Sequence, residues 1–579
     1  MLYSCLVDAD YLDTEAFMNR QQAEARGRAE TLPVLLPKLE ARLSAIAKNA
    51  PDTSVNRIRK QVQDVCRQTA TEAPGVYSLT VPTGGGKTLS SLLWAMLHAV
   101  KHGKKRIIIS IPYTSIISQT AEVLRSIFGE ENVLEHHSNV NHESNQGEDT
   151  AADKLALQKR LSAENWDFPI IVTTNVRLLE SMYASHASDC RKLHNVANSV
   201  IVFDEAQTLP AEKLQPIVSA LKVYQKAFCT SLLFSTASQP TLQGRHEGTG
   251  REVLEGFDTV REIVPKEWNL HEQLRRVNLH ILPEALDYEA IALRIKTAQR
   301  VLCIVNTRKD AAEITQRLSD MEIDEGLFHL SRMMCSEHID RTIGEIRRAL
   351  KCDDGRPVRV VTTQLIEAGV DIDFPYVMRQ EAGLDSVLQA AGRCNREGRM
   401  TELGRTEVFR IEGRNLPKGT FTYANQARKN MRYKGNLFAP EAMEEYFEQY
   451  YHQIKGFDTK DCELKMNMKD ALGKPQELMM ETADRIFKLI NGQGVQIVVN
   501  YSKSAEAVEA FRRQPCKALY RRLGQYTVNL NEHDTRLLAE SGMLEHLAEG
   551  YYYLPDSRQY DDRIGLKLDN HWLEETCII

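Results

Sequence analysis

Short apolar runs alternate with stretches of helical periodicity through the middle of the chain. Four short runs consist mainly of apolar residues, which is the pattern of strands buried on both faces: 106–111, 169–173, 200–203 and 231–235. Other segments repeat their apolar residues at helical spacing, as from Leu89 to Val100. Strands that alternate with helices in this way predict a parallel sheet.

A second series of the same kind begins near Asn278, with strands predicted at 300–305 and 358–363. Two such cores in succession indicate an α/β protein with two lobes. Helical segments precede the first lobe, and Pro33 and Pro37 are expected to interrupt one of them. Helices and a small α+β domain are expected to follow the second lobe.

A glycine-rich loop, Thr80 to Thr88, lies between a predicted strand and a predicted helix. Its glycines allow backbone N–H groups to turn inward around phosphates, and the start of the helix favours negative charge. Lys87 can reach the β- and γ-phosphates, and the Thr88 hydroxyl can bind Mg²⁺. The expected ATP-binding residues are Thr83, Gly84, Gly85, Gly86, Lys87 and Thr88.

The loop departs from the general G-x-x-x-x-G-K-[ST] spacing, because Val81 stands where the first glycine belongs. The form that remains, P-T-G-x-G-K-T, resembles the phosphate loop of superfamily 2 helicases.

Two carboxylates, Asp204 and Glu205, directly follow the predicted strand at 200–203. In a parallel sheet this strand end lies beside the phosphate loop. Asp204 can hold Mg²⁺, and Glu205 can accept a proton from the attacking water. Gln207 completes the D-E-A-Q sequence and is a third catalytic candidate.

Short hydroxyl and amide side chains follow several predicted strands. Ser235 to Ser238 is suited to relay the state of the phosphates to neighbouring loops, although a simple Ser/Thr turn explains it equally well. Such donors also suit a sugar-phosphate backbone, which they contact without reading bases. The candidate nucleic-acid contacts are Thr114, Thr173, Thr174, Asn175, Thr307, Thr362 and Thr363.

The second lobe contains two arginines three residues apart, Arg393 and Arg396, on one predicted helical face. Because this lobe has no phosphate loop, the pair makes chemical sense as arginine fingers for the nucleotide of the first lobe. Such fingers stabilise charge on the transferring phosphoryl group. Gly369 and Asp371 are further candidates for nucleotide binding.

Composition limits the partners and the compartment. The net charge is −6, so contact with nucleic acid has to come from a local basic groove. Eleven scattered cysteines without a C-x-x-C pair indicate free thiols in a reducing cytoplasm. No apolar run approaches the ~20 residues of a membrane span. We expect a soluble cytoplasmic protein without a membrane partner.

The order of these motifs resembles superfamily 2 DExH helicases from residue 52 to residue 412. More narrowly, it is similar to the CRISPR-associated helicase-nuclease of type I systems. The motifs that carry this resemblance are V-P-T-G-G-G-K-T, I-P-Y-T-S-I-I-S-Q-T, V-F-D-E-A-Q-T-L-P, S-T-A-S, I-E-A-G-V-D-I-D and Q-A-A-G-R-C-N-R. The resemblance implies two tandem RecA-like lobes, ATP and Mg²⁺ as cofactors, and single-stranded DNA and the CRISPR RNA-guided surveillance complex as partners.

It also implies a division into five parts. These are an HD-type nuclease tail with a helical linker (1–50), the ATP-binding lobe (51–265), the second lobe (266–412), a helical linker (413–487) and an accessory C-terminal domain (488–579).

The family places an HD-type metal nuclease before the motor, and Tyr3 to Glu15 resembles the tail of that domain, with Asp10 as its closing aspartate. The upstream His and His-Asp motifs are absent from this chain. One carboxylate on an exposed helix cannot hold a transition metal firmly, so nuclease activity is not expected from the chain alone. A transition metal is expected only when the HD domain is supplied, fused or as a separate nuclease chain.

Three interpretations follow. The first is an ATP-dependent translocase or helicase on single-stranded DNA in CRISPR interference. The second is a DExH RNA helicase of another pathway, because backbone contacts distinguish DNA from RNA poorly. The third is a nucleotide-gated scaffold without turnover, against which Glu205, Arg393 and Arg396 argue.

Overall fold

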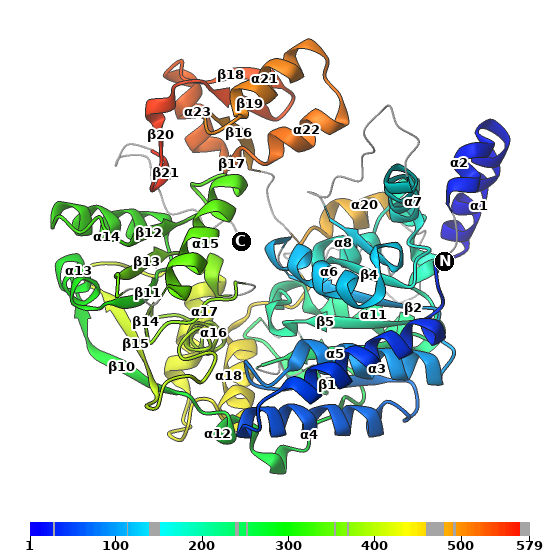
Figure 1. The fold of residues 1–579 in the computed structure, drawn as a ribbon, viewed down its shortest axis with the longest axis horizontal. Coiled ribbons are helices and arrows are strands. Elements are labelled where there is room, and N and C mark those ends of the chain that lie inside the picture. Colours follow the sequence, from blue (N-terminus) through cyan, green and yellow to red (C-terminus); the bar gives the residue numbers. More distant parts are fainter. Residues whose placement is uncertain are drawn as a thin grey trace. The chain divides into compact units, whose positions relative to one another are not determined.

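The computed structural model divides the chain into two compact units, which Figure 1 traces in sequence order. The first unit contains residues 1–274 and 430–489, and the second contains 275–429 and 490–579. The described residues are 1–26, 29–112, 114–137, 151–237, 242–250, 253–352, 355–367, 370–458, 480–489 and 494–567.

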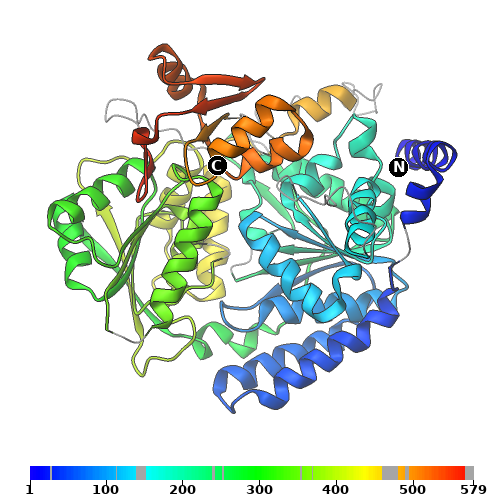
Figure 2. The ribbon, with the colours of Figure 1, turned by 45° about the horizontal axis from the view of Figure 1, so that its top comes forward.

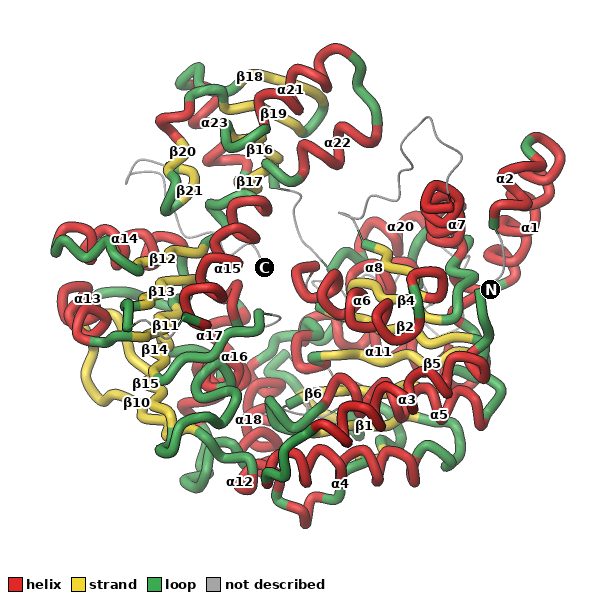
Figure 3. The backbone as a smooth tube through the Cα atoms, viewed as in Figure 1, coloured by secondary structure: helices red, strands yellow, loops and turns green. Residues whose placement is uncertain are grey.

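A seven-stranded sheet forms the centre of the first unit, in the order β3-β4-β2-β5-β6-β1-β9. Strands β4, β2, β5, β6 and β1 are labelled in Figure 3. All neighbouring strands in it are parallel. The strands are β1 (Val76–Thr80), β2 (Arg106–Ile111), β3 (Val133–His136), β4 (Ile170–Thr174), β5 (Ser199–Asp204), β6 (Ser231–Thr236) and β9 (Arg261–Glu262). The inner strands are covered on both faces, which explains their nearly continuous apolar sequences.

Helices α3 and α4 pack against α5, next to the sheet (Figure 2). Their apolar faces bury Leu39, Val62 and Trp94 in one core with the strands. The helices of the first unit are α1 (Leu2–Met18), α2 (Arg20–Ala25), α3 (Leu32–Asn49), α4 (Ser54–Thr69), α5 (Lys87–Lys101), α6 (Thr114–Phe128), α7 (Ala151–Asn165), α8 (Asn175–Ser181), α9 (Ala187–Cys190), α10 (Leu193–Val196), α11 (Leu214–Ala227), α12 (Leu270–Gln273), α18 (Pro440–Gln453) and α20 (Met480–Ile486). A small antiparallel pair joins β7 (Arg245–Glu247) to β8 (Val253–Glu255).

The sequence predicts that Pro33 and Pro37 interrupt this helical segment, but α3 is continuous. Pro33 lies in the first turn, where a backbone N–H has no helical partner in any case. Pro37 lies inside the helix, which continues to Asn49. Burial of Leu35, Leu39 and Leu43 in the core of the first unit offsets the hydrogen bond that Pro37 removes.

The second unit contains a six-stranded parallel sheet in the order β10-β15-β14-β11-β13-β12. Its strands are β10 (Val277–Leu286), β11 (Arg300–Ile304), β12 (Leu327–Leu330), β13 (Val358–Thr362), β14 (Tyr376–Gln380) and β15 (Gly404–Ile411). Its helices are α13 (Tyr288–Thr297), α14 (Arg308–Asp320), α15 (Ser336–Lys351), α16 (Leu384–Ala391) and α17 (Thr420–Asn430).

A small α+β domain completes the second unit. It has a four-stranded sheet in the order β17-β16-β19-β18. Its elements are β16 (Val495–Val499), α21 (Ser504–Arg513), α22 (Lys517–Gly524), β17 (Thr527–Leu530), α23 (Glu532–Glu540), β18 (Glu545–Ala548), β19 (Tyr551–Leu554), β20 (Tyr560–Asp561) and β21 (Gly565–Leu566). Its core continues into the second lobe through Met333 and Cys335. The predicted fold class, two parallel-sheet α/β lobes with an N-terminal helical part and a C-terminal α+β domain, is confirmed.

Within the described part of the chain, no helix is both long and apolar enough to cross a membrane.

Candidate nucleotide site

The phosphate loop connects the end of β1 to the first residue of α5, Lys87. Gly84 and Gly86 have φ angles of 84° and 86°, in the left-handed region that favours glycine. A Cβ atom on Gly85 would lie 2.4 Å from Cγ1 of Val81. The valine that replaces the first glycine of the general motif therefore occupies space that Gly85 leaves open.

A chain of hydrogen bonds joins this loop to the ends of β5 and β6. Lys87 Nζ donates to Glu205 Oε1 at 2.7 Å and lies 3.8 Å from Asp204 Oδ1. Gln207 Nε2 donates to the other Glu205 oxygen at 2.7 Å, and Thr236 Oγ1 donates to Gln207 Oε1. The structure thus brings together side chains from three separate sequence motifs.

Burial raises the pKa of Asp204, and the nearby ammonium group of Lys87 opposes that rise. Asp204 and Thr88 line the same small cavity. A carboxylate and a hydroxyl are hard oxygen donors of the kind that Mg²⁺ prefers, so the two residues fit this ion chemically.

Glu205 has a φ angle of 51°, which is left-handed and uncommon for a residue with a side chain. Such a conformation costs on the order of 1 kcal/mol or more and tends to occur at functional sites. It places the Glu205 carboxylate between Lys87 and Gln207.

Two further residues support the loop, and no sequence motif marks them. Arg59 of α4 donates from Nε to the Gly84 carbonyl oxygen at 2.9 Å and from Nη1 to Asn56 Oδ1 at 3.1 Å. Glu262 of β9 accepts hydrogen bonds from the backbone N–H and the hydroxyl of Thr80, at 3.0 and 2.7 Å. Burial raises the pKa of Glu262.

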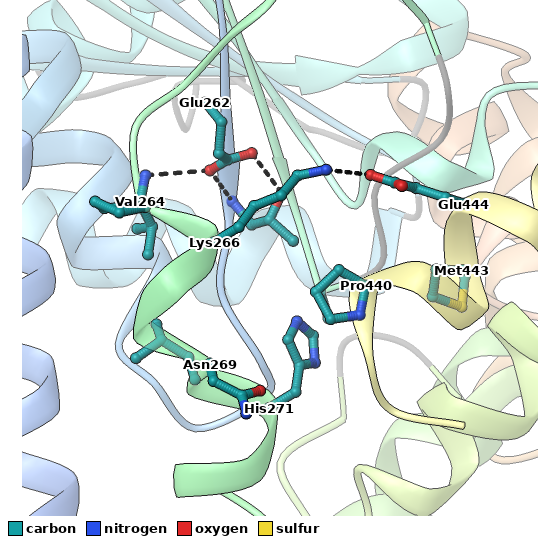
Figure 4. A pocket seen from close by; sticks show the side chains of 12 residues that line it. Glu262, Val264, Lys266, Asn269, His271, Pro440, Met443 and Glu444 are labelled. Atoms are coloured by element: carbon teal, nitrogen blue, oxygen red, sulfur yellow. Dashed lines mark hydrogen bonds and ion pairs between the residues drawn. The ribbon is translucent and has the colours of Figure 1, made fainter. Parts of the chain in front are cut away.

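A pocket of about 40 Å³ adjoins Glu262 and reaches Ala237, within the S-T-A-S sequence (Figure 4). Lys266 and Glu444 form an ion pair at its rim. Because Glu444 belongs to α18, this ion pair attaches α18 to the segment that follows β9.

The second lobe holds its two predicted arginines differently. Arg393 is buried and donates to the carbonyl oxygens of Ile366 and Glu367, at 3.0 and 2.7 Å. Arg396 keeps 26% of its side chain exposed and pairs with Asp371, with Nε 3.2 Å from Oδ1. Gly369, also predicted for nucleotide binding, lies outside the described residues.

Most of the candidate nucleic-acid contacts are engaged within their own lobe. Thr174 accepts a hydrogen bond from Arg177 N at the start of α8, and Thr307 accepts one from Asp310 N at the start of α14. The other bonds are Thr173 Oγ1 to His136 O, Ser110 Oγ to Asn175 Oδ1, and Thr362 Oγ1 to Thr363 O. Thr114 begins α6, but its side chain lies outside the described part of the chain.

Asp10 and Asp8 lie on opposite sides of α1. Asp8 is buried and accepts from Arg191 Nε at 2.9 Å and from Asn165 Nδ2 at 3.1 Å. Asp10 is exposed. No group of three His, Cys, Asp or Glu side chains that could hold a metal ion occurs among the described residues.

Two parallel-sheet lobes, with a phosphate loop beside a D-E-A-Q sequence, define a nucleotide-dependent helicase motor. The DEAD/DEAH box helicase family matches residues 57–243. The family described as the C-terminal part of the CRISPR-associated nuclease/helicase Cas3 matches residues 297–399. The chain therefore carries the domains of an ATP-dependent helicase, and its resemblance to the CRISPR-associated helicase-nucleases is confirmed.

Individual relatives agree with this assignment. The CRISPR-associated nuclease/helicase Cas3 of Haloferax volcanii is 26% identical over 469 residues, which cover 62% of this chain and 50% of that protein. This chain spans half or less of the length of the first curated relatives it matches.

Solved structures share the fold. The crystal structure of T. fusca Cas3 matches with a TM-score of 0.60 at 15% identity, over 87% of this chain and 69% of that chain. A chain in a CRISPR RNA-guided surveillance complex, pre-nicking, matches with a TM-score of 0.55 at 14% identity, over 91% of this chain and 71% of that chain.

Proposed function

We propose that this chain hydrolyses ATP to move along single-stranded DNA and to unwind target DNA in type I CRISPR interference. The observation that carries the proposal is the connected set of Lys87, Glu205, Gln207 and Thr236 at the ends of three strands. It couples a phosphate-binding lysine to a carboxylate base and to the S-T-A-S sequence. The similarity to Cas3 proteins supports the CRISPR role, and the matched chain in a surveillance complex supports that partner.

The first lobe supplies the groups for hydrolysis. The N–H groups of the glycine loop and Lys87 bind the phosphates, and Thr88 and Asp204 would hold Mg²⁺, which neutralises phosphate charge when bound. Once Lys87 turns from Glu205 to the phosphates, Glu205 can accept a proton from the attacking water. Gln207 keeps the carboxylate in position through its hydrogen bond.

In the second lobe, we assign Arg396 as the arginine finger, because its side chain is the more exposed of the two. Arg393 shapes the loop that carries Asp371, through its bonds to Ile366 and Glu367. The seven candidate nucleic-acid contacts named above, which follow the ends of strands, position the loops that contact the DNA backbone. We propose that the five-part division implied by the family resemblance serves this motor, with residues 51–265 and 266–412 as its two lobes.

The direct test measures phosphate release with no nucleic acid, with single-stranded DNA, and with single-stranded RNA of the same length. We expect stimulation by DNA. Stronger stimulation by RNA would favour an RNA helicase, and ATP binding without turnover in any mixture would favour a nucleotide-gated scaffold.

The outer face of α1 supports a second proposal, that an HD-type nuclease domain docks there. Leu2, Leu6, Asp10, Asp13 and Phe17 share this face, because their spacings of three and four residues repeat with the helix. Leu2, Leu6 and Phe17 are 90%, 69% and 87% exposed. The opposite face of α1 is fixed to the first unit by the pair of Asp8 and Arg191.

A further inference from the structure

A charged pair lies buried inside the second lobe, where the proposed mechanism does not use it. Arg379 of β14 has no exposed surface, and its Nε lies 2.6 Å from Oε1 of Glu367. β14 is an inner strand between β11 and β15, a position that parallel sheets usually fill with apolar residues. Because a well-packed apolar pair can stabilise a fold equally well, stability alone does not explain this pair.

The pair connects two loops and one helix that the motor needs. Arg379 Nη1 donates to Asn306 Oδ1 at 2.7 Å, and Asn306 directly precedes Thr307, a candidate DNA contact. Arg379 Nη2 donates to Ser386 Oγ at 2.9 Å, on the helix that leads to Arg393. Glu367 itself belongs to the I-E-A-G-V-D-I-D sequence.

The other bonds of Glu367 close the network. Its carboxylate accepts from Ser386 Oγ at 2.8 Å, and its backbone carbonyl oxygen accepts from Arg393 Nη2 at 2.7 Å. The guanidinium of Arg379 is a planar fork, so a shift of Asn306 is passed to Ser386 and Glu367 as a change in bond geometry. One buried unit thus fixes the DNA-contact loop relative to the arginine-bearing loop.

We propose that Glu367 and Arg379 are positioning residues that transmit strand binding at the Asn306–Thr307 loop to the Arg393 and Arg396 loop. The inference rests on the proposed function. It predicts that the pair governs how strongly single-stranded DNA stimulates ATP hydrolysis, and that it affects ATP binding in the first lobe little. The effect is a coupling free energy between the Asn306–Thr307 loop and the Arg393 and Arg396 loop of one lobe, and we expect it to be as large as coupling free energies between two sites usually are.

The test uses the double variant Glu367→Gln with Arg379→Gln, because removal of both charges leaves no uncompensated ion in the core. The matched control is Glu407→Gln with Arg405→Gln. Glu407 is also a buried carboxylate of the same sheet, and it binds Arg405, Arg294 and Tyr376. None of these bonds reaches Asn306, Ser386 or Glu367.

We expect the ratio of ATPase rates with and without single-stranded oligothymidine to fall about tenfold in the Glu367/Arg379 variant and to stay near the parent value in the control. The KM for ATP and the strand-free rate should change less than twofold. Arg379→Lys should not restore the ratio, because an ammonium cannot bind Asn306, Ser386 and Glu367 in one plane.

Ser386→Ala provides the same test without any loss of charge, and it decides the matter if the double variant does not fold. A reduced ratio in Ser386→Ala, with an unchanged thermal midpoint, would support the inference. A parent-like ratio in the folded double variant, or in Ser386→Ala if only that variant folds, would overturn it. A parent protein that DNA does not stimulate would instead overturn the proposed function itself.

Discussion

Lys87 and Glu205 show how a lysine and a carboxylate hold each other in position before either is needed. The ammonium lies 2.7 Å from one oxygen of Glu205, and Gln207 holds the other oxygen at the same distance. A glutamate such as Glu205 keeps a left-handed backbone conformation only when several surrounding contacts hold it there. The contacts with Lys87 and Gln207 and the left-handed backbone together hold the Glu205 carboxylate in one position.

Glu205→Gln should retain ATP binding and lose turnover, because glutamine preserves the shape but cannot accept the proton. Lys87→Ala should instead weaken ATP binding. Phosphate release and equilibrium binding of a fluorescent ATP analogue measure the two effects separately. Hydrolysis at the parent rate in Glu205→Gln would contradict the assignment of the base.

Arg396 and Arg393 should respond differently to alanine substitution. Arg396→Ala is expected to lower kcat by on the order of 10³ with little change in ATP affinity, since a finger acts on charge that develops in the transition state. Arg393→Ala should also lower the thermal midpoint, because Arg393 is buried and bonded to two carbonyl groups. If Arg396→Ala weakened ATP binding and left kcat intact, Arg396 would be an ordinary binding residue.

Sequence motifs predicted the residues that gather at the ends of β1, β5 and β6, since parallel strands bring their carboxyl ends together. The roles of Thr174 and Thr307 could not be predicted in the same way. Both cap helices, and the residue types that cap helices are also those that contact phosphates. Arg59 and Glu262 gave no local signal, because each reaches the loop from a distant part of the chain.

At the scale of elements, the strongly apolar inner strands were predictable, whereas edge strands were not. β9 has only two residues, and it supports the phosphate loop through the hydrogen bond that Glu262 accepts from Thr80 at the end of β1. Pro37 gave the wrong expectation for α3, since packing of its leucines outweighs the lost hydrogen bond.

The packing of α5 against α4 and β6 predicts a pH dependence of stability. His98 is fully buried, stacks on Trp94, and bonds to Ala70 O and Ser231 Oγ. Burial lowers the pKa of His98 to about 4 from an ordinary value of 6.5. Because the unfolded chain takes up the proton more readily, the stabilisation is complete above pH 6.5 and is lost as the pH falls towards 4.

Between pH 7.5 and pH 5, His98 should contribute a loss of about 2 kcal/mol to the free energy of unfolding of the first unit. His98→Gln keeps hydrogen-bonding groups but does not titrate, so its denaturation midpoint should fall less over this range. His533→Gln, at an exposed position of α23, serves as the control. An equal pH dependence in the parent and His98→Gln would contradict the prediction.

At the scale of the molecule, the chain enters the second unit at residue 275, returns to the first at 430 and leaves it again at 490. No sequence motif marks the residues at which the chain passes between the units. Helix α18 packs into the first unit through its buried aromatic residues, Tyr446, Phe447, Tyr450 and Tyr451. Gln215 N donates to Phe457 O, and Lys266 pairs with Glu444, so the returning segment is bound firmly to the first unit.

At the scale of the whole molecule, we expect this chain not to cleave DNA on its own. Asp10 and Asp13 are exposed carboxylates on the outer face of α1, and they belong to no group of three possible metal ligands among the described residues, so they hold a transition metal too weakly for phosphodiester hydrolysis. The purified chain should therefore hydrolyse ATP on single-stranded DNA and leave the DNA uncut with Mn²⁺, Co²⁺ or Ni²⁺. An added HD-type nuclease domain should restore cutting, and Asp10→Ala should then abolish it.

The exposed face of α1 supplies the control for this experiment. Leu6→Glu should weaken binding of the added domain, measured by analytical ultracentrifugation, and should leave the ATPase rate unchanged because α1 lies outside the nucleotide site. The matched change Val223→Glu, at an exposed residue of α11, should leave both unchanged. Metal-dependent cutting by this chain alone that survives Asp10→Ala would refute the argument, because it would require a metal site elsewhere in the chain.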